Sequence, residues 1–338
     1  MRKIIQFIGI IFCLVSQSLF SQDLHFSQFY NNATETNPAN IGFIPEADFR
    51  CGVSYRNQWS AIMSLPYRTF SAQADFQILR NKFENGWAGA GILLLSDVAG
   101  AASLRADKLF AGVAYHQMLG NSSLISAGMN IGWVRKSIDM SALKFPDQFD
   151  GRFFDASLPT AVAFSNTNVQ YLDMQTGIKY AYFPNERSYF NLGYSLSHVN
   201  LPKESFFSAT AKENIVPFRH AAFFNASLKT SDQLIIDPAC YFSTQAEALE
   251  WSAGLTLNRN LSEFTDRQLL FSFFYRNNDA LIPGIGFQAN GLRFSFSYDV
   301  TTSSLRYFNY SNGAGECSII KNGFYKQSAG RQSLCPKF

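Results

Sequence analysis

The sequence predicts an all-β protein, an antiparallel transmembrane β-barrel of about 14 strands with an N-terminal periplasmic segment and a short C-terminal tail. Three observations predict this fold class. Apolar and polar residues alternate with a period of two from residue 47 to about residue 303. Aromatic residues make up 16% of the chain and charged residues also 16%, against roughly 25% charged residues in a soluble domain. After the N-terminus, no window approaches the roughly 18 consecutive apolar residues of a membrane-spanning helix.

The alternation is clear where Phe70, Ala72 and Ala74 are interleaved with Ser71 and Gln73. Successive side chains of a strand point to opposite faces, so each such segment is expected to cross the membrane with one face toward lipid and one toward a polar interior. The expected strands lie near residues 47–56, 67–79, 86–96, 103–119, 123–136, 157–165, 168–183, 188–199, 217–230, 233–244, 247–259, 267–277, 281–289 and 292–303. Trp87, Trp133 and Trp251 are expected on the exterior, either in an interfacial aromatic girdle or elsewhere on the lipid-facing wall.

Turn residues separate the expected strands, for example at 119–122, 165–168, 277–279 and Asn290-Gly291. Two connections are long, residues 137–156 and 200–216, and by this strand count they lie on opposite sides of the membrane. One barrel domain over residues 47–303 is therefore the simplest partition.

The first 21 residues have the features of a secretory signal peptide, with cleavage expected before Gln22. Arg2 and Lys3 precede an apolar run over residues 4–15, and small and polar residues follow it. A lipoprotein site at Cys13 is disfavoured because bulky Phe12 precedes it. Export to the outer membrane is the predicted localisation. Residues 22–46 are polar and aromatic with Asn-Pro breaks, and we expect them to cap the periplasmic mouth or to fold into the lumen.

No pattern of residues in the sequence predicts catalysis, a cofactor or a metal site. The four histidines, His25, His116, His198 and His220, have no ligand-like spacing, and no HExxH, CxxC or phosphate-binding glycine loop occurs. His198, beside Ser197 and Ser195, is expected to line the polar interior and not to form a hydrolase site. The net charge of +3 is too weak to indicate a nucleic-acid partner. We therefore expect a protein that is not an enzyme.

Removal of the leader leaves four cysteines in an oxidising compartment, Cys51, Cys240, Cys317 and Cys335. Cys317 and Cys335 flank the expected tail over residues 304–338, where they form either a disulfide or two free thiols. A disulfide there would stabilise the fold by about 3 kcal/mol. Whether Cys51 and Cys240 meet is open.

Several stretches have no role in making a barrel. They are Gln22 to Tyr30 (QDLHFSQFY), Asn37-Pro38-Ala39, Tyr55 to Trp59 (YRNQW), Leu143 to Phe149 and Ser297 to Val300. Together these motifs resemble the PorP/SprF family of type IX secretion and gliding motility in Bacteroidetes, and the resemblance covers nearly the whole mature chain. One departure is the stretch Gly315 to Ile319 (GECSI), where the family commonly has a His-Glu pair.

The resemblance implies a non-enzymatic barrel, embedded in outer-membrane lipid, that works with components of the type IX machinery. Some members bind a periplasmic, peptidoglycan-binding partner, and others serve export or surface attachment of a large adhesin or secreted substrate. We expect the partner-facing residues to be His25, Phe26, Gln28, Phe29, Tyr30, Tyr55, Arg56, Asn57, Gln58 and Trp59. Two alternatives remain, a transport barrel for a small solute and a soluble β-sandwich adhesin.

Overall fold

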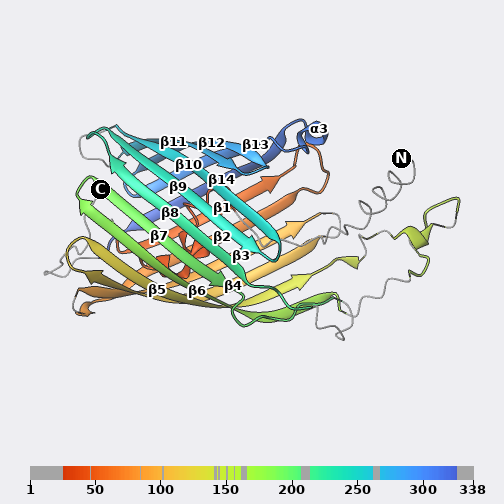
Figure 1. The fold of residues 1–338 in the computed structure, drawn as a ribbon. Helices are drawn as coiled ribbons and strands as arrows, with labels where there is room; N and C mark the ends of the chain where they lie inside the picture. Colours follow the sequence, from red (N-terminus) through yellow and green to blue (C-terminus); the bar gives the residue numbers. More distant parts are fainter. Residues whose placement is uncertain are drawn as a thin grey trace, which may run out of the picture.

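The computed structural model describes residues 26–45, 47–83, 85–100, 103–140, 143, 145–149, 151–155, 157–160, 166–206, 214–261 and 267–325. They form a closed antiparallel barrel in which each strand pairs with its sequence neighbour and β1 pairs with β14 (Figure 1). The predicted fold class is therefore confirmed. Among the described residues, no helix has the length and apolar character needed to cross a membrane.

Fourteen strands make up the barrel wall. They are β1 (Phe49–Gln58), β2 (Tyr67–Phe83), β3 (Gly86–Ala99), β4 (Leu104–Leu119), β5 (Ser123–Ser137), β6 (Asn168–Asn185), β7 (Ser188–Ser197), β8 (Arg219–Lys229), β9 (Leu234–Gln245), β10 (Ala248–Asn260), β11 (Arg267–Arg276), β12 (Ala280–Ala289), β13 (Leu292–Thr301) and β14 (Asn312–Gly323). The short helices are α2 (Ala33–Thr36), η1 (Pro38–Asn40), η3 (Pro146–Gln148) and α3 (Arg306–Asn309).

The predicted alternation places apolar side chains outside and polar side chains inside. On β5, Ile125 and Ile131 are exposed on the outer face, whereas Ser126 and Asn130 are buried in the interior. On β2, Ser71 is likewise fully buried. This is the arrangement expected of a wall that has hydrocarbon on one side and a polar lumen on the other.

The expected strand over residues 157–165 is wrong. Residues 157–160 adopt turn and irregular conformations, and residues 161–165 lie outside the described residues. The strands on either side pair directly with each other, β5 with β6, from Ser137 opposite Asn168 onward. Residues 138–167 are therefore one long connection, and the turn expected at 165–168 belongs to it.

The fourteenth strand is β14, in the segment that the sequence assigned to a tail. The sequence pattern misses it because the outward positions Gly313, Gly315 and Cys317 carry no large apolar side chain, so the period-two signal is weak. β14 nevertheless pairs along its length with both β13 and β1. The barrel thus extends to Gly323, and the tail is shorter than residues 304–338.

Both long connections, residues 138–167 and 198–218, lie at the same end of the barrel, and not on opposite sides as expected. The expected strand over residues 157–165 would have added one more crossing between the two connections. Without that crossing, both connections are at the same end of the barrel. We call this the long-loop end; it also holds the β13–β14 connection with α3 (Figure 1). The opposite end, with the tight β2–β3, β4–β5 and β12–β13 turns, is called the short-turn end.

Residues 26–45, here called the luminal segment, run through the interior of the barrel. Three clusters of buried apolar side chains surround it, and each contains one of its phenylalanines, Phe26, Phe29 or Phe43. Phe26 shares a cluster with Val134, near the long-loop end of β5, and Phe43 shares one with Leu124, near the short-turn end. The segment therefore passes from the long-loop end toward the short-turn end, where β1 begins.

Candidate functional site

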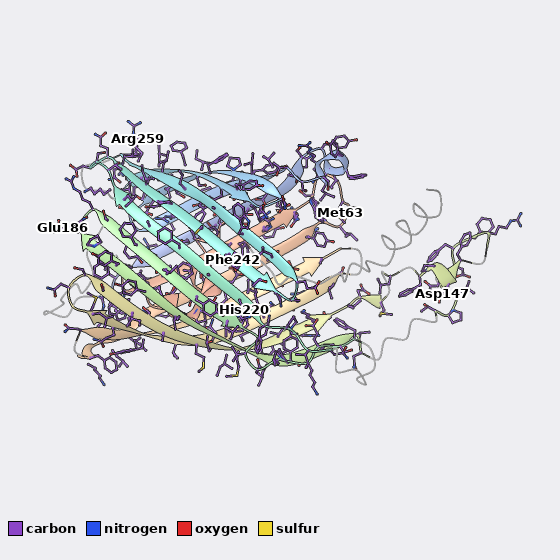
Figure 2. The ribbon with its side chains drawn as sticks, viewed as in Figure 1. Met63, Asp147, Glu186, His220, Phe242 and Arg259 are labelled. Atoms are coloured by element: carbon purple, nitrogen blue, oxygen red, sulfur yellow. The ribbon has the colours of Figure 1, made fainter. Side chains whose placement is uncertain are left out.

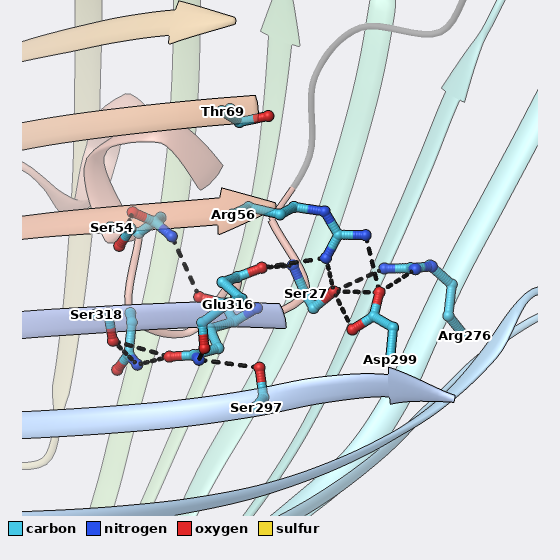
Figure 3. Close-up of polar contacts among 12 residues, drawn as sticks. Ser27, Ser54, Arg56, Thr69, Arg276, Ser297, Asp299, Glu316 and Ser318 are labelled. Carbon is cyan, nitrogen blue, oxygen red and sulfur yellow. Dashed lines mark hydrogen bonds and ion pairs between the residues drawn. The ribbon is translucent and has the colours of Figure 1, made fainter. Parts of the chain in front are cut away.

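Four charged side chains meet inside the barrel near its long-loop end (Figure 3). They are Arg56 of β1, Arg276 of β11, Asp299 of β13 and Glu316 of β14, and we call them the charged latch. All four are buried. Each lies at an inward-facing position close to the end of its strand, so barrel closure brings them together.

The latch pairs its charges closely. Asp299 Oδ2 lies 2.8 Å from Nη2 of Arg56 and 2.6 Å from Nη2 of Arg276. Glu316 Oε2 lies 3.3 Å from Nη1 of Arg56. Two positive and two negative groups thus balance, as buried charges require, since an unpaired buried ion costs several kcal/mol.

The first residues of the luminal segment bind to this latch. The backbone amides of Ser27 and Gln28 donate to the two carboxylate oxygens of Glu316, at 2.8 and 2.9 Å. The Ser27 hydroxyl donates to Asp299 Oδ1 at 2.8 Å and accepts from Arg276 Nη1 at 2.9 Å. Hydrogen bonds to ionised groups are stronger than neutral ones. The carboxylates therefore fix both the charge balance of the wall and the position of the chain inside it.

Polar side chains extend this attachment along the segment. Gln28 Nε2 donates to Ser297 Oγ at 2.9 Å, and Ser318 Oγ donates to Gln28 Oε1 at 2.8 Å. Further along, the Thr34 hydroxyl donates to Gln73 Oε1 at 2.6 Å. Each of these contacts joins the segment to a different strand of the wall, β13, β14 or β2.

A different kind of contact holds residues 37–42. There the inward positions of four neighbouring strands are glycines, and we call them the glycine wall: Gly89 and Gly91 of β3, Gly112 of β4, Gly128 of β5 and Gly177 of β6. A Cβ atom on Gly89 would lie 2.1 Å from the Ile41 carbonyl oxygen, and one on Gly128 would lie 2.4 Å from that of Pro38. The missing side chains are what lets the segment approach the sheet so closely.

Buried donors satisfy the carbonyl groups at this contact. His116 Nε2 lies 2.8 Å from the Ile41 oxygen, while its Nδ1 lies 2.8 Å from Ser126 Oγ. The carbonyl partner assigns the proton to Nε2. Trp87 Nε1 donates to the Gly42 oxygen at 2.9 Å. The Gly42 amide donates to Asp75 Oδ2 at 2.8 Å, and Arg50 holds both oxygens of that carboxylate.

The prediction for Trp87 is therefore wrong: it is 1% exposed and faces the interior. Its neighbours in the sequence, Gly86 and Ala88, are small, so nothing local shows which face it occupies. Trp133 and Trp251 are exposed on the outer wall, as predicted. The glycines of β3 mark the contact with the luminal segment. In the sequence, glycine recurs at inward positions of successive strands, and this recurrence could have predicted a close contact with another segment of the chain.

The residues predicted to face a partner divide into two groups. Phe26, Gln28, Phe29 and Arg56 are buried in the lumen, and Tyr30 is largely covered there. Tyr55 is exposed on the outer wall, whereas Asn57, Gln58 and Trp59 are partly exposed where β1 reaches the long-loop end. His25 lies outside the described residues. The structure thus brings the described part of the QDLHFSQFY stretch, residues 26–30, close to Arg56. These residues contact the inner face of the barrel wall and are not available at an outer surface.

The three cysteines in the described part of the chain are free thiols. Cys317 is a free thiol on the outer face of β14, which corrects the placement of this residue in a tail, and Cys335 lies outside the described residues. Cys51 and Cys240 are free and exposed on the outer wall. No group of three or more His, Cys, Asp or Glu side chains that could hold a metal ion occurs in the described part of the chain.

His198 lies inside the barrel with Nδ1 3.0 Å from Asp173 Oδ1. The neighbouring Ser195 hydroxyl donates to the Thr36 carbonyl at 3.0 Å. Ser195 therefore hydrogen-bonds to the luminal segment. His198 and Ser195 both line the interior, as the sequence predicted.

Large aromatic side chains are exposed at the long-loop end. Tyr307, Phe308 and Tyr310, in and after α3, are 71%, 79% and 82% exposed, and we call them the aromatic rim. Phe149 and Phe153 in the β5–β6 connection are also exposed. Asp147 of that connection projects well beyond the barrel, while His220 and Phe242 lie on its wall (Figure 2). Exposed apolar groups of this kind mark interaction surfaces.

A closed barrel with a lipid-facing apolar wall, filled by its own N-terminal segment, defines an outer-membrane barrel protein. The chain belongs to the family described as type IX secretion system membrane protein PorP/SprF, whose sequence profile matches residues 18–319. It is accordingly an outer-membrane protein of type IX secretion. No curated protein matches the chain.

Solved structures with similar folds include two toluene transporters. The Ralstonia pickettii toluene transporter TbuX is 12% identical, with a TM-score of 0.52 over 87% of this chain and 94% of that one. The Pseudomonas putida toluene transporter TodX is 11% identical, with a TM-score of 0.54 over 88% and 95% of the two chains. At these identities the likeness concerns the fold alone.

Proposed function

We propose that this barrel supports type IX secretion without being an enzyme, by holding a large surface adhesin or secreted substrate at its long-loop end, in the manner of gliding-motility members of the family. Family membership supports the secretion role. The observation that carries the choice of surface is the aromatic rim, Tyr307, Phe308 and Tyr310, which is more exposed than any aromatic side chain of the strands. Aromatic side chains are enriched in protein interfaces and supply much of their binding energy.

The orientation of the barrel supports this surface. Outer-membrane barrels have short periplasmic turns and longer outer loops. By that rule the long-loop end faces outward, where a displayed adhesin is held, and the partly exposed Gln58 and Trp59 lie at the same end.

The filled lumen also favours a partner outside the barrel. The charged latch and the glycine wall attach the luminal segment at both of its halves. A polypeptide could not pass through without displacing the segment, which would remove the hydrogen bonds that its amides and hydroxyl make with the buried carboxylates of Asp299 and Glu316. A periplasmic peptidoglycan-binding partner, which some family members use, would contact the short-turn end instead.

The test replaces the rim. In the variant Tyr307→Ala, Phe308→Ala, Tyr310→Ala, we expect at least about a tenfold loss of partner retained at the cell surface, because truncating an interfacial aromatic costs about 2 kcal/mol. Quantifying the partner on whole cells and in culture fluid measures it. The matched control is Phe83→Ala, Tyr115→Ala, Tyr182→Ala, three exposed aromatics near the short-turn end. Equal retention by both variants would contradict the proposal.

A second candidate is transport of a small solute, favoured by a cavity of about 260 Å³ inside the lumen. Deleting the gene separates the two functions. Loss of surface adhesin, of gliding or of secretion supports the first, and loss of solute uptake with intact secretion supports the second.

A further inference from the structure

A cavity of about 260 Å³ lies between the luminal segment and the barrel wall. The segment contributes aromatic side chains, Tyr30 and Phe43, to its lining. The wall contributes Tyr189 and three asparagines, Asn191, Asn225 and Asn322. The cavity thus combines an apolar body with a few polar groups, the composition typical of small-molecule sites.

The cavity lies toward the short-turn end of the barrel. Tyr189 and Asn191 are near the first residue of β7, which starts at that end, and Asn322 is the second-last residue of β14, which finishes there. The opposite end of the lumen is occupied by the charged latch and by the cluster around Phe26. A ligand would therefore enter from the short-turn end.

The three asparagines have unused hydrogen-bonding capacity. Their Oδ1 atoms are buried and have no hydrogen-bond partner among the described residues. Asn191 is only 6% exposed, and it lies directly opposite Asn225 in the β7–β8 pairing. Burying an unpaired amide oxygen costs about 1 to 3 kcal/mol, so three of them around one cavity need an explanation.

The aromatic side chains of the lining pack against other rings. Phe43 stacks on Tyr189 with ring centroids 6.3 Å apart, and Tyr30 stacks on Phe274 at 5.0 Å. An apolar cavity of about 150 Å³ is large enough to bind benzene, so this one has room for a substituted ring. Arg50, the one charged residue of the lining, is already paired with Asp75. No charged group is therefore required of the ligand.

We propose that this cavity binds a small uncharged aromatic molecule bearing hydrogen-bond donors, such as an aromatic alcohol or amine. The ring packs against Tyr30, Phe43 and Tyr189, and a donor of the ligand pairs with the amide oxygen of Asn191 or Asn225, which rotation of the amide group turns toward the cavity. The inference rests on the cavity and on neither of the two functions above.

Binding of phenol and indole to the purified full-length chain in detergent tests the proposal, with toluene as the probe that lacks a donor and empty micelles as the blank. We expect saturable binding of phenol and indole, and toluene at least about fivefold weaker because it satisfies no amide. The variant Asn191→Leu, Asn225→Leu should lower phenol affinity by about tenfold. The matched control is Asn130→Leu, a buried inward asparagine with an unpaired oxygen that does not line the cavity.

Absence of saturable binding, equal affinity for toluene and phenol, or equal loss in the Asn130→Leu control would each overturn the proposal. Thermal unfolding of each variant checks that it is folded. If the double variant does not fold, the single variants Asn191→Leu and Asn225→Leu provide the same comparison. Because the readout is binding to purified protein, failure here leaves the surface-retention test of the aromatic rim unaffected.

Discussion

The two halves of the luminal segment are attached to the barrel by different physics. Residues 26–32 are held by side chains, chiefly the carboxylates of Asp299 and Glu316 with their arginine partners. Residues 37–42 are held by shape, because their backbone lies directly against the glycine wall. The first attachment depends on a few charges and the second on the absence of side chains over several strands.

This difference determines how each attachment responds to a single substitution. Removing the Asp299 carboxylate takes away the negative charge that both arginines share, and leaves Arg56 with Glu316 at 3.3 Å and Arg276 with the more exposed Asp279. Adding one methyl group to the glycine wall introduces a local overlap that small shifts of the segment relieve in part. The expected effects therefore decrease from the latch, to the wall, to the neutral hydrogen bonds between them.

The largest effect is expected for Asp299→Asn. It removes the negative charge shared by Arg56 and Arg276, and we expect it to lower the free energy of unfolding by about 3 to 5 kcal/mol. Urea denaturation of the refolded protein measures the loss. The matched control is Asp232→Asn, whose ion pair with Lys229 is at the surface and should contribute less than about 1 kcal/mol. Similar losses in both variants would show that the latch does not stabilise the fold.

A smaller effect is expected for Gly89→Ala. Its Cβ would lie 2.1 Å from the Ile41 oxygen, so the segment must shift, at a cost of about 1 to 3 kcal/mol. Limited proteolysis of residues 37–44 should become faster. Gly315→Ala is the control, because the nearest atom to its Cβ would be 3.9 Å away on the outer face. Unchanged proteolysis and stability in Gly89→Ala would refute close packing against the wall.

The smallest effect is expected for Thr34→Val, which lies between the two attachments. The substitution keeps the shape and removes the hydrogen bond to Gln73, for a loss of about 1 kcal/mol. Hydrogen exchange over residues 33–36 should become faster while exchange at Ser27 and Gln28 stays slow. Thr176→Val, at an outward position of β6, is the control. Faster exchange at Ser27 as well would mean that the halves are not independent.

Most of the wall could be predicted from the sequence because each strand carries its own evidence, the period-two alternation imposed by lipid on one side and polar groups on the other. The prediction failed where this local signal was misleading. The sequence alternates over residues 157–165, yet β5 pairs directly with β6 and the described residues 157–160 form no strand, whereas β14 joins the barrel with glycine and cysteine at outward positions. β14 forms a strand because its backbone hydrogen-bonds to β1 and β13, although its sequence shows only weak alternation.

The sequence by itself determined which sides of most strands face lipid and which face the lumen, and it contains the motifs that match the family. It also predicts an export signal. Only the tertiary structure decided what those motifs do inside the barrel. Ser27 and Glu316 are separated by 289 residues, and closure of β1 against β14 brings them within 2.8 Å. Such contacts cannot be seen in a pattern of neighbours along the chain, because they arise only when a cylinder closes around its own N-terminal segment.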